Sequence, residues 1–120
     1  MQKMIVKKPW GTYEVLLDEP NYKVKRIVVH PYERFSLQYH KHREEHWVVV
    51  EGDGIVQVNE KEYPAYVRTH WVILPTQKHR ATAGPNGLVF IETQTGDCRE
   101  EDIVRLEDDY GRLDSSKVSQ

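Results

Sequence analysis

Short apolar runs separated by turn residues recur along this chain. Tyr22–His30, Trp71–Leu74 and Leu88–Thr93 are rich in β-branched and aromatic residues, as strands are. No stretch shows the sustained 3.6-residue periodicity of an amphipathic helix. About eight such runs, spaced roughly 8–12 residues apart, predict an all-β sandwich or barrel. A jelly roll is one way in which such a sheet limits its exposed edges.

Glycine and proline set the expected strand boundaries. Val48–Val50 is predicted to be a buried strand that enters a turn at Gly52–Gly54, and the next strand is expected over Ile55–Val58. A second turn is predicted around Ala83–Gly87. The last element, over Ile103–Leu106, is a weaker strand or a short helix.

Size and composition indicate one small domain over residues 1–120, with a polar tail at 114–120 that is expected to fray. An aromatic content of 10% argues against disorder. The single cysteine, Cys98, excludes an internal disulfide and fits a reducing cytosol, so a cytoplasmic location is predicted. Apolar runs stay well short of a membrane span, and the N-terminal segment lacks a signal-peptide core.

The net charge of −2 argues against nucleic acid as a partner. The charge is unevenly distributed, because basic residues predominate over residues 3–43 and acidic residues over 92–114. A basic half that lines a cleft would suit an anionic small molecule. The same residues on the outside would form a solvated face.

The densest group of possible metal ligands lies between residues 36 and 52. His40 and His42 are two residues apart, so on a strand both imidazoles would point to one side. Glu45, beyond a short polar turn, could bring its carboxylate to the same point, with His46 as the substitute ligand. Two imidazoles and a carboxylate leave coordination positions open, as a catalytic divalent metal requires. The alternative is a solvated polar turn.

His79 is a further candidate ligand, because it follows the turn at Pro75 and leads into a strand. In a closed barrel this hairpin could face the segment that carries His40 and His42. It would then complete a set of three histidines and one carboxylate. Taken alone, His79 could equally be an ordinary surface histidine.

Several motifs resemble those of a known family. His40-x-His42-x-x-Glu45, followed by Gly52, is similar to the first cupin motif, and the segment 75–79 is similar to the second. More specific segments resemble the cupin domain of type II mannose-6-phosphate isomerases over residues 8–112: KPWG-x-YEV, YKVKRIVV, SLQ-x-H-x-HR-x-EHW, ETQTGD and EEDIVRLEDDYGR. The resemblance implies a small cupin-type jelly-roll barrel, also called a double-stranded β-helix.

In that family the domain is often the C-terminal part of a bifunctional enzyme that also carries a mannose-1-phosphate guanylyltransferase domain. The 120 residues contain no Gly-rich nucleotide loop, so a stand-alone cupin chain is expected. The family also usually has a proline-x-glycine-x-x-histidine hairpin before its last metal ligand. The segment 75–79 is one residue shorter and lacks the glycine.

The resemblance implies interconversion of mannose 6-phosphate and fructose 6-phosphate, in nucleotide-sugar and polysaccharide biosynthesis. A base must move a proton between C2 and C1, and Glu92, an acidic residue within an apolar strand, is the first candidate for this catalytic role. An outward-facing charge on the sheet is the alternative for Glu92. A divalent cation would stabilise negative charge on the sugar oxygens. Zinc is favoured and manganese, iron, cobalt or nickel would also fit, with the ligands His40, His42, Glu45 and His79.

The phosphate of such a substrate requires positive charge. Arg43 and Arg80, each next to an expected ligand, are predicted to bind it, and Arg80 is also assigned to catalysis. Gln38 and Gln94 are predicted to orient substrate hydroxyls or to fix the imidazole tautomers. Further basic side chains are expected behind the arginines: Lys23, Lys25 and Arg26.

Two other functions remain open. A non-catalytic cupin could bind a sugar or nucleotide sugar as an accessory module, and the unusual hairpin at 75–79 keeps this alternative open. An iron-dependent dioxygenase is the other, since fold does not determine reaction. A homodimer through an exposed strand, such as the N-terminal one, is expected, and no membrane partner. Four aromatic residues are predicted to lie in the core or an interface, with sugar stacking as an alternative for one: Trp10, Trp47, Trp71 and Tyr110.

Overall fold

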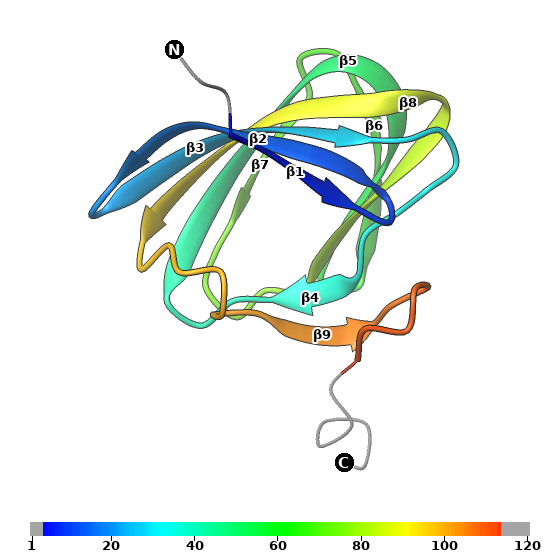
Figure 1. Ribbon diagram of the computed structural model, residues 1–120. Helices are drawn as coiled ribbons and strands as arrows, with labels where there is room; N and C mark the ends of the chain where they lie inside the picture. The colour runs from blue at the N-terminus through cyan, green and yellow to red at the C-terminus, as the bar shows by residue number, and fades with distance from the viewer. Residues whose placement is uncertain (1–3, 114–120) are drawn as a thin grey trace.

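The computed structural model describes residues 4–113 and confirms an all-β architecture (Figure 1). The predicted frayed tail, residues 114–120, lies outside the described residues. The weak element expected over 103–106 is a strand. The strands are β1 (Met4–Lys8), β2 (Gly11–Glu19), β3 (Tyr22–Val29), β4 (Leu37–Tyr39), β5 (Arg43–Val58), β6 (Lys61–Tyr66), β7 (His70–Ile73), β8 (His79–Gly96) and β9 (Val104–Glu107).

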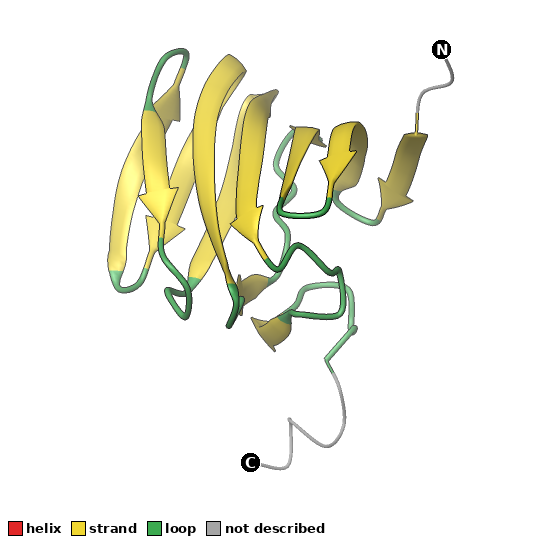
Figure 2. Cartoon of the chain, turned by 90° about the vertical axis from the view of Figure 1, so that its left-hand side faces the viewer, coloured by secondary structure: helices red, strands yellow, loops and turns green. Residues whose placement is uncertain are grey.

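All strand pairs are antiparallel and belong to one curled sheet (Figures 1 and 2). One path through the sheet runs β1-β2-β3-β8-β4-β9, and β5 pairs with β6, β7 and β8. The long strand β8 therefore joins the two halves, since it pairs with β3 and β4 as well as with β5. This arrangement brings the two ends of the described chain to one cavity.

Two predicted turns are instead interior parts of long strands. β5 continues through Gly52–Gly54, and β8 continues through the segment 83–87. A Cβ on Gly52 would lie 2.0 Å from the carbonyl oxygen of Gly87, and one on Gly54 would lie 2.1 Å from that of Thr82. The glycines are thus needed for close approach of β5 and β8, and the register shifts there without a reversal of the chain.

The apolar core lies inside the curled sheet and is built from alternate residues of its strands. Val49 is 1% exposed, whereas its neighbours Val48 and Val50 are 44% and 40% exposed. The prediction that all three are buried was therefore wrong. Trp47 lies at the centre, with its ring centroid 4.5 Å from that of Phe90 and 5.8 Å from that of Phe35. Trp47 also joins the core to the buried polar groups on the inner face of the sheet, because its Nε1 donates to Glu45.

The edge of the sheet at β1 is apolar in part. Met4 and Ile5 are exposed there, and Leu16 and Leu17 are exposed on the neighbouring strand β2. The homodimer expected through the N-terminal strand stays a prediction. Within residues 4–113 the fold contains no helix capable of crossing a membrane.

Candidate metal centre and cavity

Glu45 is the centre of the candidate site and lies on the inner face of β5. Strand alternation turns Arg43, Glu45 and Trp47 inward and His46 outward. The buried Glu45 carboxylate accepts hydrogen bonds from Arg43 Nε at 2.9 Å and from Trp47 Nε1 at 3.1 Å. These two donors hold the carboxylate in one orientation.

His40 follows β4 and directs its ring toward Glu45. Its Nδ1 lies 2.5 Å from the carbonyl oxygen of Asp102, so Nδ1 donates and Nε2 carries the lone pair. Nε2 is 3.3 Å from Glu45 Oε2. Burial, reinforced by the positive charge of Arg43, lowers the pKa of His40 to about 3. The ring is therefore neutral at pH 7, the form that a metal ion requires.

His79 begins β8 and completes the group. Its ring is buried, and its Nδ1 donates to the carbonyl oxygen of Gln77 at 2.9 Å. Nε2 lies 3.6 Å from Glu45 Oε1 and has no hydrogen-bond partner among the described residues. Burial lowers the pKa of His79 to about 4, so this ring is also neutral at pH 7.

The turn before His79 reaches the site without a glycine. Thr76 adopts the left-handed backbone conformation, with φ at 72°, that a glycine would adopt at no steric cost. Its N–H donates to the carbonyl oxygen of His40 at 2.7 Å, and the Gln77 side chain accepts from the N–H of Leu74. The short hairpin is therefore tied directly to the backbone of the first histidine.

The residues present fit a divalent metal ion. One ligand atom from each of His40, Glu45 and His79 lies within 4.8 Å of the others. Both histidines donate Nδ1–H to a backbone carbonyl, the arrangement by which proteins orient a ligating imidazole. The buried Nε2 of His79 carries a lone pair that accepts no hydrogen bond from residues 4–113, so it is available to a metal ion. Two nitrogens and a carboxylate oxygen suit zinc and other first-row metals alike.

Arg43 and Gln38 surround this triad. Arg43 Nη2 donates to His40 Nε2 at 3.0 Å, and Gln38 Nε2 lies 3.4 Å from the same nitrogen. An ion at His40 Nε2 would replace these two contacts, while the bond from Arg43 to Glu45 could persist. Arg43 therefore positions ligands, and its guanidinium also donates to the carbonyl oxygen of Arg99 at 3.3 Å. It is not the free phosphate-binding fork that the sequence suggested.

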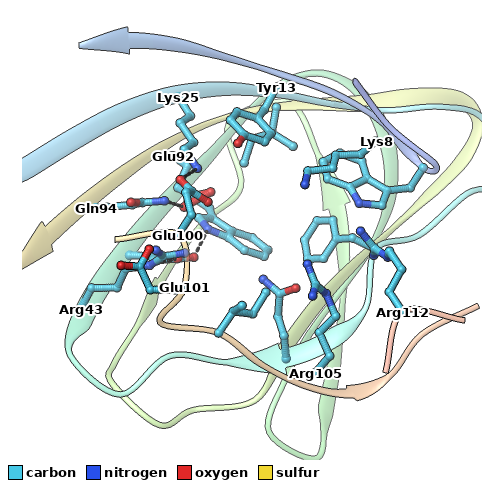
Figure 3. Close-up of a pocket in the computed structure, with 17 residues that line it drawn as sticks. Lys8, Tyr13, Lys25, Arg43, Glu92, Gln94, Glu100, Glu101, Arg105 and Arg112 are labelled. Atoms are coloured by element: carbon cyan, nitrogen blue, oxygen red, sulfur yellow. Dashed lines mark hydrogen bonds and ion pairs between the residues drawn. The ribbon is translucent and has the colours of Figure 1, made fainter. Parts of the chain in front are cut away.

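Glu45 lines a cavity of about 390 Å³. Figure 3 shows this cavity with its lining side chains. Its apolar wall includes Trp10, Ile27 and Phe35, and its polar wall includes Gln38, Glu92 and Gln94 from the predicted site. We call the part of the site formed by His40, Glu45, His79 and Glu92 the ligand side, after the candidate metal ligands that it contains. A volume of this size accommodates a small molecule and not a macromolecular chain.

Glu92 lies on the inner face of β8 and is 5% exposed, so its alternative as an outward-facing charge is wrong. Gln94 Nε2 donates to Glu92 Oε1 at 2.7 Å, and Gln94 Oε1 is buried without a partner among the described residues. Burial, together with the negative charge of Glu45, raises the pKa of Glu92 to about 7. A carboxyl group with that pKa can both accept and return a proton near neutral pH.

Lys25 also lines the cavity, but its charge is already paired. Its Nζ donates to Glu100 Oε1 at 2.6 Å and lies 4.1 Å from the centre of the Tyr13 ring. Lys23 donates to the same carboxylate and to the carbonyl oxygen of Cys98. These two lysines therefore hold the segment around Glu100 against β3.

Three further cations that the sequence did not indicate as site residues face the same cavity from its other side. Lys8, Arg105 and Arg112 lie together opposite Glu92 and Gln94 (Figure 3), and we call them the basic side. Both arginines belong to the EEDIVRLEDDYGR segment that carried much of the family resemblance. That motif could have indicated the two arginines as site residues. It lies far along the chain from residues 36–46, so the sequence did not show that the two segments share a cavity.

The structure does not bring His42 or His46 into the site. His42 is exposed in the bend between β4 and β5, where the Asp102 carboxylate accepts from the N–H groups of Lys41 and His42 at 3.0 and 2.9 Å. Because that bend is not a strand, the expected alternation of His40 and His42 does not apply. His46 faces outward and pairs with Glu44 at 2.7 Å.

Arg80 and Arg26 are also outside the cavity. Arg80 is 4% exposed, but Nε donates to the carbonyl oxygen of Phe35 at 2.9 Å and Nη1 to Glu107 Oε1 at 3.0 Å. It joins β8 to β9, and strand alternation directs it away from the side that His79 faces. Its assignment to phosphate binding and catalysis was therefore wrong. Arg26 points outward toward Glu51, at 3.6 Å.

Comparison with known proteins identifies relatives along most of the chain. The family model "Mannose-6-phosphate isomerase C-terminal" matches residues 1–108. A mannose-1-phosphate guanylyltransferase of Klebsiella pneumoniae is 37% identical over 108 residues, which are 88% of this chain and 23% of that protein. The alginate biosynthesis protein AlgA of Pseudomonas aeruginosa is 41% identical over 109 residues, 89% of this chain and 23% of AlgA. The chain thus spans about a quarter of the length of these relatives.

Solved structures confirm the cupin fold. An RmlC-like cupin from Shewanella frigidimarina superposes with a TM-score of 0.75 at 22% identity, over 83% of this chain and 88% of that one. Pac13, a nucleoside dehydratase, superposes with a TM-score of 0.73 at 18% identity, over 96% and 90% of the two chains. At these identities the likeness concerns the fold alone.

Proposed function

The chain belongs to the family of mannose-6-phosphate isomerase C-terminal domains, and from this premise we propose that it is a metal-dependent isomerase that interconverts mannose 6-phosphate and fructose 6-phosphate. The observation that carries the proposal is that Glu92 and the metal-ligand candidate Glu45 line one cavity. An aldose–ketose isomerisation needs a proton carrier and a stabiliser of oxygen charge at neighbouring atoms. The names of its relatives, a mannose-1-phosphate guanylyltransferase and proteins of alginate and xanthan biosynthesis, support a sugar substrate.

Glu92 is the proposed proton carrier. Its carboxylate removes the proton from C2 of the aldose, the C2–H electron pair forms the C1–C2 double bond, and the C1 carbonyl oxygen takes up the negative charge. After a proton passes from O2 to O1, the protonated Glu92 returns its proton to C1 and C2 becomes the carbonyl. No electron is gained or lost overall, so no redox partner is needed. The raised pKa of Glu92, about 7, suits both halves of this exchange.

His40, Glu45 and His79 would hold the metal ion, and the Gln38 amide beside His40 is placed to add an oxygen ligand if it turns. When bound, the ion would supply positive charge that stabilises the developing negative charge on the sugar oxygens. Arg43 and Trp47 keep the Glu45 carboxylate oriented through their hydrogen bonds. The unpartnered Oε1 of Gln94 can accept a hydrogen bond from a substrate hydroxyl and so orient the sugar next to Glu92.

The proposal is tested by following the C2 proton directly. Purified protein with its metal content measured is incubated with mannose 6-phosphate in deuterated water, and NMR follows fructose 6-phosphate and deuterium at C1 and C2. Conversion that a chelator removes and added metal restores is the expected result. A folded, metal-loaded protein that neither converts the sugar nor exchanges its C2 proton would contradict the proposal and favour a non-catalytic binder. Oxygen uptake with bound iron would contradict it in favour of a dioxygenase.

A further inference from the structure

We propose that the basic side, Lys8 with Arg105 and Arg112, is the subsite that binds the phosphate group of the substrate. This inference rests on the proposed function and specifies its substrate class as a phosphomonoester. It replaces the phosphate ligands that the sequence suggested, Arg43 and Arg80. Both of those guanidinium groups are committed within the protein.

The three cations come from segments far apart in the sequence. Lys8 ends β1, Arg105 lies on β9, and Arg112 follows β9, yet all three line the cavity that Glu45 and Glu92 also line. Figure 3 shows them on the side opposite Glu92 and Gln94. A ligand with an anionic group at one end and reactive carbons at the other would therefore meet the basic side and the ligand side simultaneously.

Arg105 provides the sharpest evidence that the basic side is built to bind an anion. Its Nε is buried and has no hydrogen-bond partner in the part of the chain that the structure describes. A buried charged donor without an acceptor is costly, so an acceptor from outside the described residues is expected at Arg105 Nε, and an anion inside the cavity is one that also matches its charge. Arg34, by comparison, makes two bonds to Asp109, at 2.7 and 2.8 Å.

The electrostatics of the basic side point the same way. Burial lowers the pKa of Lys8, and the positive charges of Arg105 and Arg112 lower it further. Burial followed by the charge of Arg112 lowers the pKa of Arg105 in the same manner. Lys8 has no ion-pair partner among residues 4–113, and only Arg112 has a close one, Asp108 at 2.9 Å. An anion with more than one negative charge reduces the repulsion among these three cations more than a singly charged anion does.

The chemistry of the cavity selects a phosphomonoester over other anions. A phosphate dianion offers three oxygens to two guanidinium groups and an ammonium, whereas a single carboxylate would leave donors unused. The carboxylates of Glu92 and Glu100 line the remaining wall, so a second negative group on the ligand would be repelled there. The subsite therefore suits a sugar with one terminal phosphate.

The test compares Arg105→Gln with Arg68→Gln. Both variants remove one arginine charge. Arg68 is the control because it is exposed in the turn between β6 and β7 and does not line the cavity. Calorimetric titrations use inorganic phosphate, fructose 6-phosphate, fructose and a nucleotide sugar. Arg105→Gln should weaken the binding of inorganic phosphate and fructose 6-phosphate about tenfold or more, because a charge-assisted hydrogen bond is lost. Arg68→Gln should leave both unchanged.

Lys8→Gln is the second variant, because Lys8 lies at the end of the edge strand β1, outside the apolar core. Circular dichroism checks that the variant is folded. It should weaken the same two ligands and leave fructose unaffected. Unchanged binding in both Arg105→Gln and Lys8→Gln, or an equal loss in Arg68→Gln, would overturn the inference. Tighter binding of the nucleotide sugar than of fructose 6-phosphate through Arg105 would also overturn it, because the subsite would then serve a diphosphate.

These titrations are independent of turnover. Binding of fructose 6-phosphate that depends on Arg105, without exchange of the C2 proton, would contradict the isomerase proposal and leave the phosphate subsite standing. Isomerisation with an unchanged KM in Arg105→Gln would retain the isomerase and remove the subsite.

Discussion

The ligand side and the basic side of the site differ in how the hydrogen-bonding capacity of their polar groups is satisfied. On the ligand side, His40, Glu45 and Glu92 each have a protein partner at hydrogen-bond distance, and only the Nε2 of His79 is left without one. On the basic side, like charges face one another and the Nε of Arg105 has no partner among the described residues. Groups that take part in a reaction must be held in the right orientation before the substrate binds. Groups that bind an anion can instead have their hydrogen bonds completed by the anion itself.

The largest effect is expected on metal retention, and it should separate two histidines that the sequence treats alike. His79→Ala removes a buried ligand, so the purified protein should lose its bound metal and its isomerase activity. His42→Ala changes an exposed side chain and should retain both. Elemental analysis and circular dichroism of the two variants provide the measurement. Metal loss in His42→Ala with retention in His79→Ala would reverse the assignment of ligands.

The next effect concerns Glu92, the proposed proton carrier on the ligand side. Glu92→Gln keeps the hydrogen bond from Gln94 but cannot accept the C2 proton, so kcat should fall roughly 10²–10⁴-fold. Metal content should remain that of the unaltered protein. Gln94→Ala, which removes only the orienting partner, should cost less. A Glu92→Gln variant with normal turnover would assign the base to another residue.

The same substitution should stabilise the metal-free protein at high pH. The pKa of Glu92 is raised from 4.5 to about 7 on folding, so the buried carboxyl costs nothing when protonated below pH 4.5, and its cost grows as pH rises through 7. At pH 8 the Glu92→Gln variant should therefore unfold with about 3 kcal/mol more free energy than the unaltered chain. Urea titrations of chelator-treated protein at pH 5 and pH 8 measure this, and an equal difference at both pH values would contradict it.

A smaller effect is expected at Arg80, which lies outside both sides of the cavity. Arg80→Met retains the aliphatic stem but leaves the carbonyl oxygen of Phe35 without its donor, so the free energy of unfolding should fall by about 2 kcal/mol. KM for the phosphorylated sugar should not change, in contrast to Arg105→Gln. Denaturant titration measures the free energy of unfolding, and steady-state kinetics measure KM. A raised KM with unaltered stability would return Arg80 to the phosphate site.

The smallest effect concerns the turn before His79, which is hydrogen-bonded to the backbone of His40. Thr76 is a β-branched residue in the left-handed region, and Asn tolerates that conformation better. Thr76→Asn should therefore raise the free energy of unfolding by roughly 1 kcal/mol and preserve metal content. The matched control is Thr95→Asn, at an exposed extended position of β8, where no gain is expected. Destabilisation by Thr76→Asn would show that the threonine side chain itself supports the turn.

Local pattern was sufficient for much of the fold. The apolar runs, with their β-branched and aromatic residues, located the β3, β7 and C-terminal β8 segments correctly. The glycines at 52 and 54 were assigned to a turn, because a glycine in sequence reads equally as a turn or as a close approach of two backbones. Which of the two holds depends on the partner strand, and that partner is 25 or more residues away in this chain.

The ligand triad was predictable in part for the same reason. His40, Glu45 and His79 were found by residue type and motif, but His42 was added because alternation was assumed across residues that the Asp102 carboxylate holds in a bend. Arg80 was assigned to the same site as His79 because the two are adjacent in sequence, although adjacent residues of a strand face opposite sides. Both errors came from treating nearness in sequence as nearness in space.

The sequence by itself determined the all-β class, and its four candidate metal ligands include the three that the structure buries together. It also drew attention to Glu92 as an acidic residue in an apolar strand, because these features depend on residue type and short-range periodicity. Only the tertiary structure decided that His42 faces outward, that Arg80 joins strands, and that Lys8 meets Arg105 and Arg112 in the cavity. The physical reason is that the curled antiparallel sheet brings the first and last described strands to one cavity, and no local pattern encodes which distant side chains will share it.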